Sequence, residues 1–233
     1  MTTIGLIGSG HIGSTVARLA VNAGHEVVLS NSRGPETLQD LVDELGSHAR
    51  AGTAEDAATA GELVVVTIPL GAVDQIPVEP LRGKVVIDTC NYYSQRDGHI
   101  AALDDESTTT SELVQAHLPE SKVAKAFNNI SYVHLLNLAR PAGSPDRSVL
   151  AIAGDDPGAK ATVTTFLDSI GYDAYDAGPL SEGWRYQRDT VAYAGLYNGD
   201  TTGTWPPPPG SGAQITADTM REKLAEARRY RDM

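Results

Sequence analysis

Three glycines near the N-terminus have the spacing that most directly indicates chemistry in this sequence. Gly8, Gly10 and Gly13 follow a short apolar run at residues 3–7, and apolar residues then recur with a helical period over residues 12–23. A glycine turn between a strand and a helix lets backbone N–H groups and the positive end of the helix dipole face a phosphate. We therefore predict a dinucleotide pyrophosphate site here rather than a turn without a ligand.

The remaining residues of this loop are Ser9, His11 and Ile12. Ser9 adds a hydroxyl to the predicted site, and Ile12 begins the helix. His11 either contacts a phosphate or faces the solvent. We include the whole loop in the predicted cofactor site.

The tip of the second predicted strand indicates which dinucleotide binds. This strand covers residues 26–30, and Asn31, Ser32 and Arg33 follow it. NAD-specific proteins usually have an Asp or Glu at this point, which binds the ribose hydroxyls and would repel a 2′-phosphate. The arginine guanidinium can donate two parallel charged hydrogen bonds to that phosphate, and Asn and Ser can donate neutral hydrogen bonds. The tip therefore favours NADP(H), although Arg33 also suits a solvated turn before Gly34.

Strands and helices alternate along most of the chain. This order predicts an α/β protein of the Rossmann type, with a doubly wound, mostly parallel sheet, helices on both faces and a small C-terminal helical appendage. The expected strands cover residues 3–7, 26–30, 50–52, 63–68, 84–88, 122–126, 148–153 and 172–176. The expected helices cover residues 12–23, 38–45, 54–60, 111–117 and 159–170.

The alternation stops after this region, which divides the chain into two expected parts. Residues 1–178 form an NADP-binding Rossmann domain, and residues 179–233 form a segment that completes the substrate pocket and is a candidate dimer contact. Within this segment we expect a helix over 180–197, a proline-rich loop over 203–212 and a charged helix over 216–231. The last helix either packs on a neighbouring subunit or lies on the surface.

Several residues fall at the carboxyl ends of the expected strands, where doubly wound sheets bind their ligands. Ile68 and Pro69 end one strand and would form the wall of the channel between adenosine and nicotinamide. Asn91 and Asn128 follow two other strands. They either bind the ribose and the nicotinamide amide or only satisfy nearby backbone groups.

The sequence contains no spacing typical of a Ser/His/Asp or Cys/His catalytic group, and no Tyr-x-x-x-Lys proton relay. We therefore assign no catalytic residue. Hydride transfer between two stacked planar rings requires orientation and exclusion of water more than a strong acid or base. Tyr92 and Tyr93 either form the floor under such a ring or fill the core of their loop. A predicted NADP site without a recognisable proton donor suits a redox partner that is itself a flat cofactor.

Composition excludes several classes of partner. The net charge of −12 argues against nucleic acid or an anionic membrane surface, so phosphates must be bound by local groups. No apolar stretch approaches the roughly 20 residues of a membrane span. The single cysteine, Cys90, excludes an internal disulfide and suits a reducing cytoplasm, and no Cys/His cluster has the spacing of a metal site. We expect a cytoplasmic protein without a bound metal.

Taken together, the motifs resemble those of the NADP oxidoreductases that depend on the deazaflavin coenzyme F420. The matching segments follow the family's order over roughly residues 2–180, and they are residues 8–13, 31–33, 65–69, 125–128, 154–156 and 176–180. The resemblance implies a Rossmann domain with a small C-terminal part, assembled as a homodimer, and F420 as a co-substrate. It implies 2′-phosphate contacts at Ser9, Asn31, Ser32 and Arg33, and a nicotinamide-side wall near Ile68, Pro69 and Phe127.

The sequence departs from the family's pattern after Leu180, in the part that helps to form the deazaflavin pocket. Our candidates for the lining of the substrate pocket are Tyr92, Tyr93, Trp184 and Trp205. The leading hypothesis is an NADP(H)-dependent oxidoreductase that exchanges hydride with F420 or another flat acceptor. The alternatives are an NADPH-dependent reductase of another small molecule, such as an imine or a quinone, and a non-catalytic NADPH-binding sensor.

Overall fold

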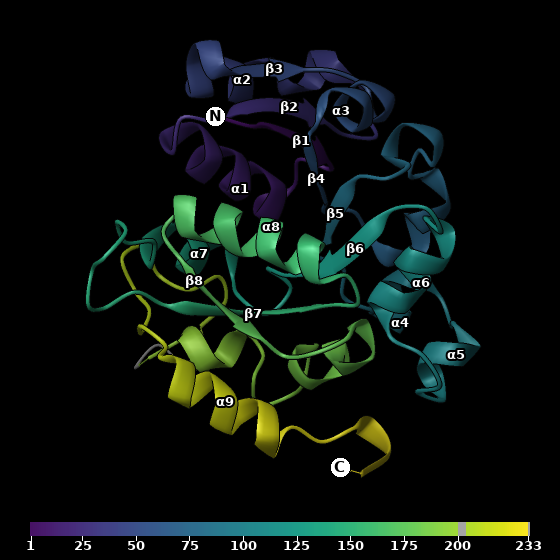
Figure 1. The fold of residues 1–233 in the computed structure, drawn as a ribbon, viewed down its shortest axis with the longest axis vertical. Helices are drawn as coiled ribbons and strands as arrows, with labels where there is room; N and C mark the ends of the chain where they lie inside the picture. The colour runs from purple at the N-terminus through teal and green to yellow at the C-terminus, as the bar shows by residue number, and fades with distance from the viewer. Residues whose placement is uncertain (200–203, 233) are drawn as a thin grey trace.

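The computed structural model describes residues 1–199 and 204–232. In this part of the chain, eight strands form one sheet in the order β3-β2-β1-β4-β5-β6-β7-β8 (Figure 1). Every neighbouring pair is parallel except β6 and β7, which are antiparallel. The strands are β1 (Thr3–Ile7), β2 (Glu26–Ser30), β3 (Ala49–Ala51), β4 (Leu63–Val66), β5 (Val85–Asp88), β6 (Lys122–Lys125), β7 (Val149–Gly154) and β8 (Asp173–Asp176). The predicted fold class is confirmed.

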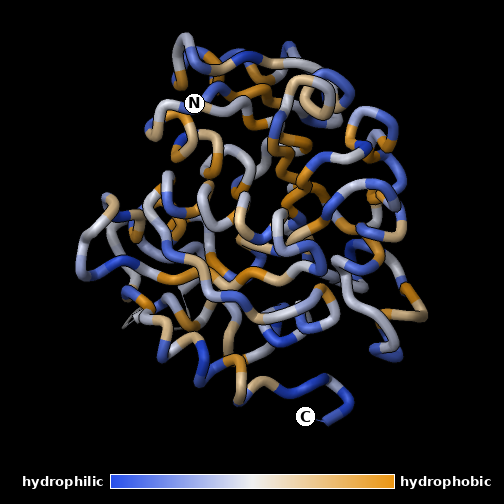
Figure 2. The backbone as a smooth tube through the Cα atoms, viewed as in Figure 1, coloured by the Kyte–Doolittle hydropathy of each residue, from blue (hydrophilic) through white to orange (hydrophobic). Residues whose placement is uncertain are grey.

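Alternate residues of the central strands face two hydrophobic cores, one on each side of the sheet. Ile4 and Leu6 of β1 belong to one core, and Ile7 belongs to the other. The neighbouring strand β4 follows the same rule, with Val65 in the first core and Val64 in the second. Because both faces are covered, these strands are apolar throughout, as buried parallel strands are. Figure 2 shows hydrophobic residues concentrated in these inner strands and hydrophilic residues along the outer segments.

Helices cover both faces of the sheet. Buried residues of α1 and α8 belong to the first core, and those of α3 and α6 belong to the second. Thr53 and Thr109 begin α3 and α6 with capping boxes, in which the threonine and the third helical residue bond each other's backbone. The helices are α1 (His11–Asn22), α2 (Gln39–Leu45), α3 (Ala54–Ala60), α4 (Ser94–Asp97), α5 (Ala101–Asp104), α6 (Thr110–His117), α7 (Tyr132–Asn137), α8 (Pro157–Ser169) and α9 (Ala217–Glu226).

The prediction of a helix over residues 180–197 was wrong. Two 3₁₀ turns, Leu180–Tyr186 and Ala194–Tyr197, take its place, and Asp189 between them has a positive φ of 67°. Tyr186 and Tyr197 are fully buried, and their hydroxyls donate to backbone carbonyls of β6 and β7. Because the two anchors dock separately on the sheet, the segment between them cannot keep a continuous helical path.

The last helix is shorter than the expected 216–231. Thr216 caps α9 by accepting from the backbone N–H of Thr219, and the helix ends at Glu226. Beyond it, the Glu106 carboxylate accepts the backbone N–H groups of Tyr230 and Arg231. These bonds hold the end of the chain away from the helix axis. In the described chain α9 packs on β7, β8 and the 3₁₀ turn at Leu180–Tyr186.

Other boundaries differ less. The fourth strand ends at Val66 rather than at residue 68, and helix α7 was not expected. Residues 200–203 and 233, which include the start of the expected proline-rich loop, lie outside the described residues. No helix among the described residues has the length and hydrophobicity needed to cross a membrane.

Candidate functional site

The three glycines of the first loop have different surroundings. Gly8 has a φ of +103°, and a Cβ there would lie 2.6 Å from the carbonyl oxygen of Thr67. A Cβ on Gly13 would lie 2.2 Å from the carbonyl oxygen of Gly8. By contrast, a Cβ on Gly10 would meet no atom within 4 Å. Gly8 and Gly13 are therefore required by packing, whereas Gly10 leaves open the space that a ligand would fill.

Helix α1 begins at this open space. Gly10 is its N-cap, no side chain caps its first turn, and no acidic residue lies there. Its first N–H groups and the positive end of its dipole are therefore available to an anion. Ser9 and Thr67 shape the loop, since the Ser9 hydroxyl donates to the Ser30 carbonyl at 2.8 Å and the Thr67 hydroxyl donates to the Gly8 carbonyl at 2.7 Å. These features match a pyrophosphate-binding loop.

The tip of β2 is a turn organised by Asn31. Its Oδ1 accepts the backbone N–H groups of Arg33 and Gly34 at 2.9 and 3.0 Å, and its Nδ2 donates to the Thr37 hydroxyl at 2.8 Å. The Asn31 side chain therefore shapes the turn, whereas Ser32 and Arg33 are exposed. Among the described residues Arg33 has no ion-pair partner, so its guanidinium is available to a phosphate.

A cavity of about 570 Å³, which we call the glycine-loop cavity, joins these features. Such a volume lies within the usual range of ligand sites, about 300–1,000 Å³. It is lined by residues 7–10 and 30–33 and by Ala54, Thr67, Ile68, Pro69, Ala72 and Gln75. The loop glycines, the β2 tip and the Ile68-Pro69 wall predicted from the sequence thus meet around one space.

A second cavity of about 350 Å³ lies at the ends of β4, β5 and β6, and we call it the strand-end cavity. It shares Gly10, Thr67, Ile68 and Pro69 with the first, so the two cavities adjoin at the end of β4. It is lined by Gly10, His11, Ile12, residues 67–69, residues 89–91, Tyr93, Arg96, Phe127, Asn128, residues 130–132, Tyr193 and Trp205. His11 is exposed, and its ring stacks on that of Tyr132 at 4.3 Å between centroids.

The two predicted asparagines bond to each other in the strand-end cavity. Asn91 Nδ2 donates to the Asn128 carbonyl at 2.8 Å, and Asn128 Nδ2 donates to the Tyr186 carbonyl at 2.9 Å. Asn128 Oδ1 is buried and has no partner among the described residues. Buried acceptors are usually paired, so this oxygen is suited to a donor on a ligand. Phe127 is fully buried with a φ of 63°, a backbone conformation that clusters at ligand sites.

A buried ion pair supports the loop after β5, and sequence reasoning missed it. Lys125 is 1% exposed and Asp88 is fully buried; Nζ of Lys125 lies 3.4 Å from Oδ2 of Asp88. Nζ also donates to the Cys90 carbonyl at 2.9 Å, while Asp88 Oδ1 accepts the Cys90 backbone N–H at 2.8 Å. The pair therefore holds Cys90 from both sides. The available signal was a charged residue at the carboxyl end of each strand, directly after buried apolar residues.

We expect Lys125→Met to destabilise the protein by about 3–5 kcal/mol, because it leaves the Asp88 carboxylate buried without its cation. Urea denaturation measures this change in the free energy of unfolding. The matched control is Arg82→Met, which breaks the exposed pairs with Glu79 and Glu120 and should cost less than about 1 kcal/mol. Equal stability of the two variants would contradict the role given to Lys125.

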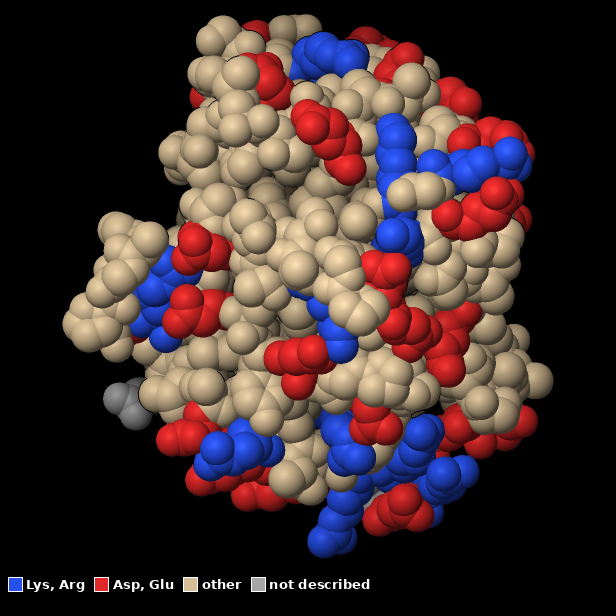
Figure 3. Space-filling model, in the orientation of Figure 1, with Lys and Arg blue, Asp and Glu red and all other residues tan. Residues whose placement is uncertain are grey.

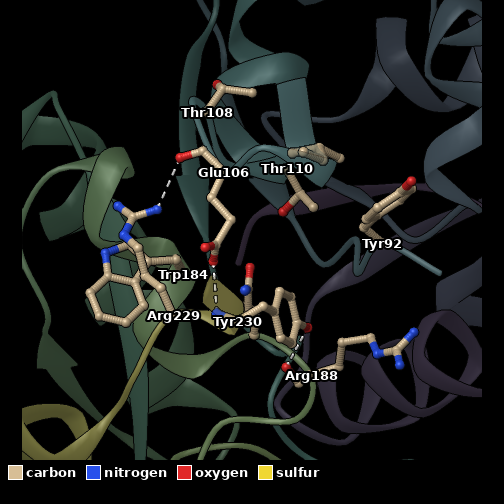
Figure 4. Close-up of a pocket in the computed structure, with 10 residues that line it drawn as sticks. Tyr92, Glu106, Thr108, Thr110, Trp184, Arg188, Arg229 and Tyr230 are labelled. Carbon is tan, nitrogen blue, oxygen red and sulfur yellow. Dashed lines mark hydrogen bonds between the residues drawn. The ribbon is translucent and has the colours of Figure 1, made fainter. Parts of the chain in front are cut away.

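The four aromatic residues expected around the substrate do not lie together. Tyr93 and Trp205 line the strand-end cavity, and Trp205 is 72% exposed. Tyr92 and Trp184 line a separate cavity of about 20 Å³, roughly the volume that holds one water molecule (Figure 4). The Tyr92 hydroxyl donates to the Asp104 carboxylate at 2.7 Å, so Tyr92 faces away from Tyr93 although the two are adjacent in sequence.

Trp184 is part of the packing that holds the C-terminal residues. The guanidiniums of Arg185 and Arg229 each lie 4.6 Å from its ring. Figure 4 shows Arg229 donating to the backbone carbonyl of Glu106 and the Tyr230 backbone bonded to the Glu106 carboxylate. Because these groups already occupy it, this small cavity is a structural contact rather than a substrate site.

Charge on the molecular surface is mixed. Figure 3 shows acidic and basic side chains interspersed over the face that it draws, with basic groups gathered near α9 and the C-terminus. No group of three or more His, Cys, Asp and Glu residues in the described chain is arranged to hold a metal ion. Cys90 is buried, and burial raises the pKa of its thiol well above the usual value. A thiol in this state is a poor nucleophile.

Comparison with known proteins finds a family match in the N-terminal part of the chain. Residues 3–92 match the family described as NADP oxidoreductase coenzyme F420-dependent. The resemblance to this family is confirmed. These residues run from β1 to the loop after β5, and so include the glycine loop, the β2 tip and the Ile68-Pro69 wall.

A curated relative carries a similar name. The chain is 30% identical to the F420-dependent NADP reductase of Methanocaldococcus jannaschii over 149 residues. These residues cover 61% of this chain and 65% of that protein. It is 38% identical over 53 residues to the YjhV protein of Escherichia coli, 39% of that protein. The chain thus spans less than two thirds of the length of either relative.

Solved structures share the fold over more of the chain. One, from Arthrobacter sp. FB24 and described as a proposed F420-dependent NADP-reductase, is 27% identical with a TM-score of 0.66, covering 78% of this chain and 87% of that one. The hypothetical protein SMa0349 from Sinorhizobium meliloti is 24% identical with a TM-score of 0.71, covering 93% and 97%. The second likeness extends the shared fold into the C-terminal segment.

Proposed function

We propose that this protein is an NADP(H)-dependent oxidoreductase that transfers hydride between the nicotinamide and a flat acceptor, with the deazaflavin coenzyme F420 as that acceptor. The observation that carries the proposal is the junction of the two cavities at residues 67–69. One cavity has the groups for a dinucleotide, and the other has room for a second ring beside it. The family match and the name of the archaeal relative support the choice of F420.

The residues of the glycine-loop cavity suit NADP. The space beside Gly10 and the uncapped first turn of α1 would receive the pyrophosphate, and Ser32 and Arg33 would bind the 2′-phosphate. Asn31 shapes their turn and also lines the cavity. When bound, NADPH supplies a hydride to the acceptor.

The residues of the strand-end cavity orient the two rings and keep water out. Ile68 and Pro69 lie where the cavities meet, and buried Phe127 and Ile130 add apolar surface. Asn128 Oδ1 would accept a hydrogen bond from the nicotinamide amide. Orientation and exclusion of water are what hydride transfer between stacked rings requires, so no acid or base needs to be assigned.

We further propose that residues 1–178 are the cofactor-binding domain and that residues 179–233 complete the acceptor pocket. Tyr193 and Trp205 support this division, because both come from the second segment and line the strand-end cavity. Assembly as a homodimer and a cytoplasmic location are proposed from the family resemblance and from the single buried cysteine.

The test is consumption of NADPH, followed by absorbance, with a panel of acceptors that includes F420, a quinone and a cyclic imine. We expect F420 to be reduced fastest, and NADPH to be used in preference to NADH. Reduction of the imine alone would replace F420 with another small molecule. Tight NADPH binding without turnover of any acceptor would instead support a sensor.

A further inference from the structure

Two tyrosine hydroxyls meet in the strand-end cavity. Tyr93 follows β5 and Tyr193 precedes the 3₁₀ turn at Ala194–Tyr197, and their hydroxyl oxygens lie 3.0 Å apart. Both residues line the cavity. Tyr93 was predicted from the sequence to line the substrate pocket, whereas Tyr193 was not among the predicted residues.

Counting protons shows that this pair has a hydrogen-bond donor to spare. Two hydroxyls carry two protons, and only one proton lies between the two oxygens. The other contact of the pair is Asn91 Nδ2, a donor that lies 3.5 Å from the Tyr193 oxygen. Among the described residues no further acceptor is bonded to either hydroxyl. Whichever tyrosine donates to its neighbour, one O–H therefore remains for a ligand.

The pair is held in a defined position. The guanidiniums of Arg96 and Arg188 each lie 4.8 Å from the centre of the Tyr93 ring. Arg96 is bonded to the Asp97 carboxylate, whose side chain is fully buried, and to the Asn91 carbonyl at 2.9 Å. Arg188 is paired with Asp189 at 2.7 Å. These contacts restrict the Tyr93 ring and so fix the direction of its hydroxyl.

Tyr193 also stays protonated at any working pH. Burial, followed by its hydrogen bond with Tyr93, raises the pKa of Tyr193 well above the usual value for a phenol. Tyr193 therefore acts as a hydrogen-bond donor rather than as a proton source. In the reaction NADPH loses a hydride, a neutral acceptor gains it with a proton from solvent, and both tyrosines keep their own protons.

We propose that the Tyr93–Tyr193 hydroxyl pair donates a hydrogen bond to a ring carbonyl of the acceptor and thereby selects flat rings that carry a carbonyl. Deazaflavins and quinones have such an oxygen, whereas a phenazinium ring has none. The proposal rests on the proposed function, because it places the acceptor in the strand-end cavity. The cavity also has apolar surface at Ile68, Pro69, Phe127 and Ile130, and beside that surface this donor discriminates by hydrogen bonding.

The test compares acceptors in the full-length protein. The variants are Tyr93→Phe, Tyr193→Phe and the double variant, and the control is Tyr175→Phe, which alters a half-buried tyrosine of β8 outside the cavity. The acceptors are F420, a naphthoquinone and the carbonyl-free methylphenazinium cation. For each we measure kcat/KM with saturating NADPH, corrected for the reaction without enzyme, and separately the Kd of NADPH.

In the double variant we expect kcat/KM for F420 and for the quinone to fall about 10-fold, the loss of one net hydrogen bond. The value for methylphenazinium and the Kd of NADPH should stay within about 2-fold, and Tyr175→Phe should change neither. Each single variant keeps one O–H but loses the neighbouring hydroxyl that holds it in place, so its ratio of quinone to methylphenazinium reduction should fall by about 2- to 5-fold, less than in the double variant.

An unchanged ratio of quinone to methylphenazinium reduction in the double variant would overturn the inference while leaving the proposed function intact. If the double variant does not fold, the ratio of quinone to methylphenazinium reduction is measured in the two single variants. An unchanged ratio in both of them overturns the inference. If the unmodified protein reduces no acceptor, the proposed function fails and this inference fails with it.

Discussion

A Gly10→Val protein is expected to fold like the unmodified chain and to bind NADPH at least roughly 100-fold more weakly, because each hydrogen bond to a charged phosphate contributes about 1.5–3 kcal/mol. The backbone of Gly10 has a φ of −76°, which valine adopts, and a Cβ there meets no protein atom within 4 Å. The added side chain would project into the space assigned to the pyrophosphate. Thermal unfolding and titration of NADPH fluorescence measure the two properties separately.

The matched contrast is Gly13→Ala in the same loop. Its Cβ would lie 2.2 Å from the Gly8 carbonyl oxygen, so the loop must shift and the free energy of unfolding should fall by about 1–3 kcal/mol. Gly195→Ala, which has open space and lies outside both cavities, is the neutral control. Unchanged NADPH affinity in Gly10→Val would show that the pyrophosphate does not lie beside Gly10.

The second large effect is expected on cofactor choice. Arg33→Ala should weaken NADPH binding by about 10- to 100-fold and leave NADH binding nearly unchanged, since a hydrogen bond to a charged group contributes about 1.5–3 kcal/mol. Arg33 is exposed, lines the glycine-loop cavity and has no ion-pair partner among the described residues. Isothermal titration with NADPH and NADH measures both affinities.

The control for this prediction is Arg50→Ala. Arg50 is an exposed arginine on β3, outside the glycine-loop cavity, and its removal changes the net charge by the same amount. A general effect of charge would weaken NADPH binding equally in both variants. Equal affinities for NADPH and NADH in the unmodified protein would refute the assignment of NADP.

The sheet and most of its helices could be predicted because their determinants are local. The apolar runs of β1 and β4 and the helical period of α1 are visible in short windows of sequence. The expected helix over 180–197 failed for the opposite reason. Its conformation depends on two tyrosines that bond to distant strands. Tyr186 bonds to β6, 61 residues earlier in the chain, and Tyr197 bonds to β7, 48 residues earlier.

The residues of the candidate site also fall into those that the local sequence predicts and those that only the tertiary structure brings together. By itself the sequence determined the glycine loop and the polar tip of β2, because each is a continuous motif whose residues act together on one turn. Tertiary structure alone decided that Tyr93 joins Tyr193, 100 residues away, while its neighbour Tyr92 turns toward Asp104. It also decided that Lys125 and Asp88 meet under Cys90. The neighbouring strands β5 and β6 bring Asp88 and Lys125 together, and the packing of the C-terminal segment places Tyr193 beside Tyr93. Neither arrangement can be deduced from the spacing of residues within a single motif.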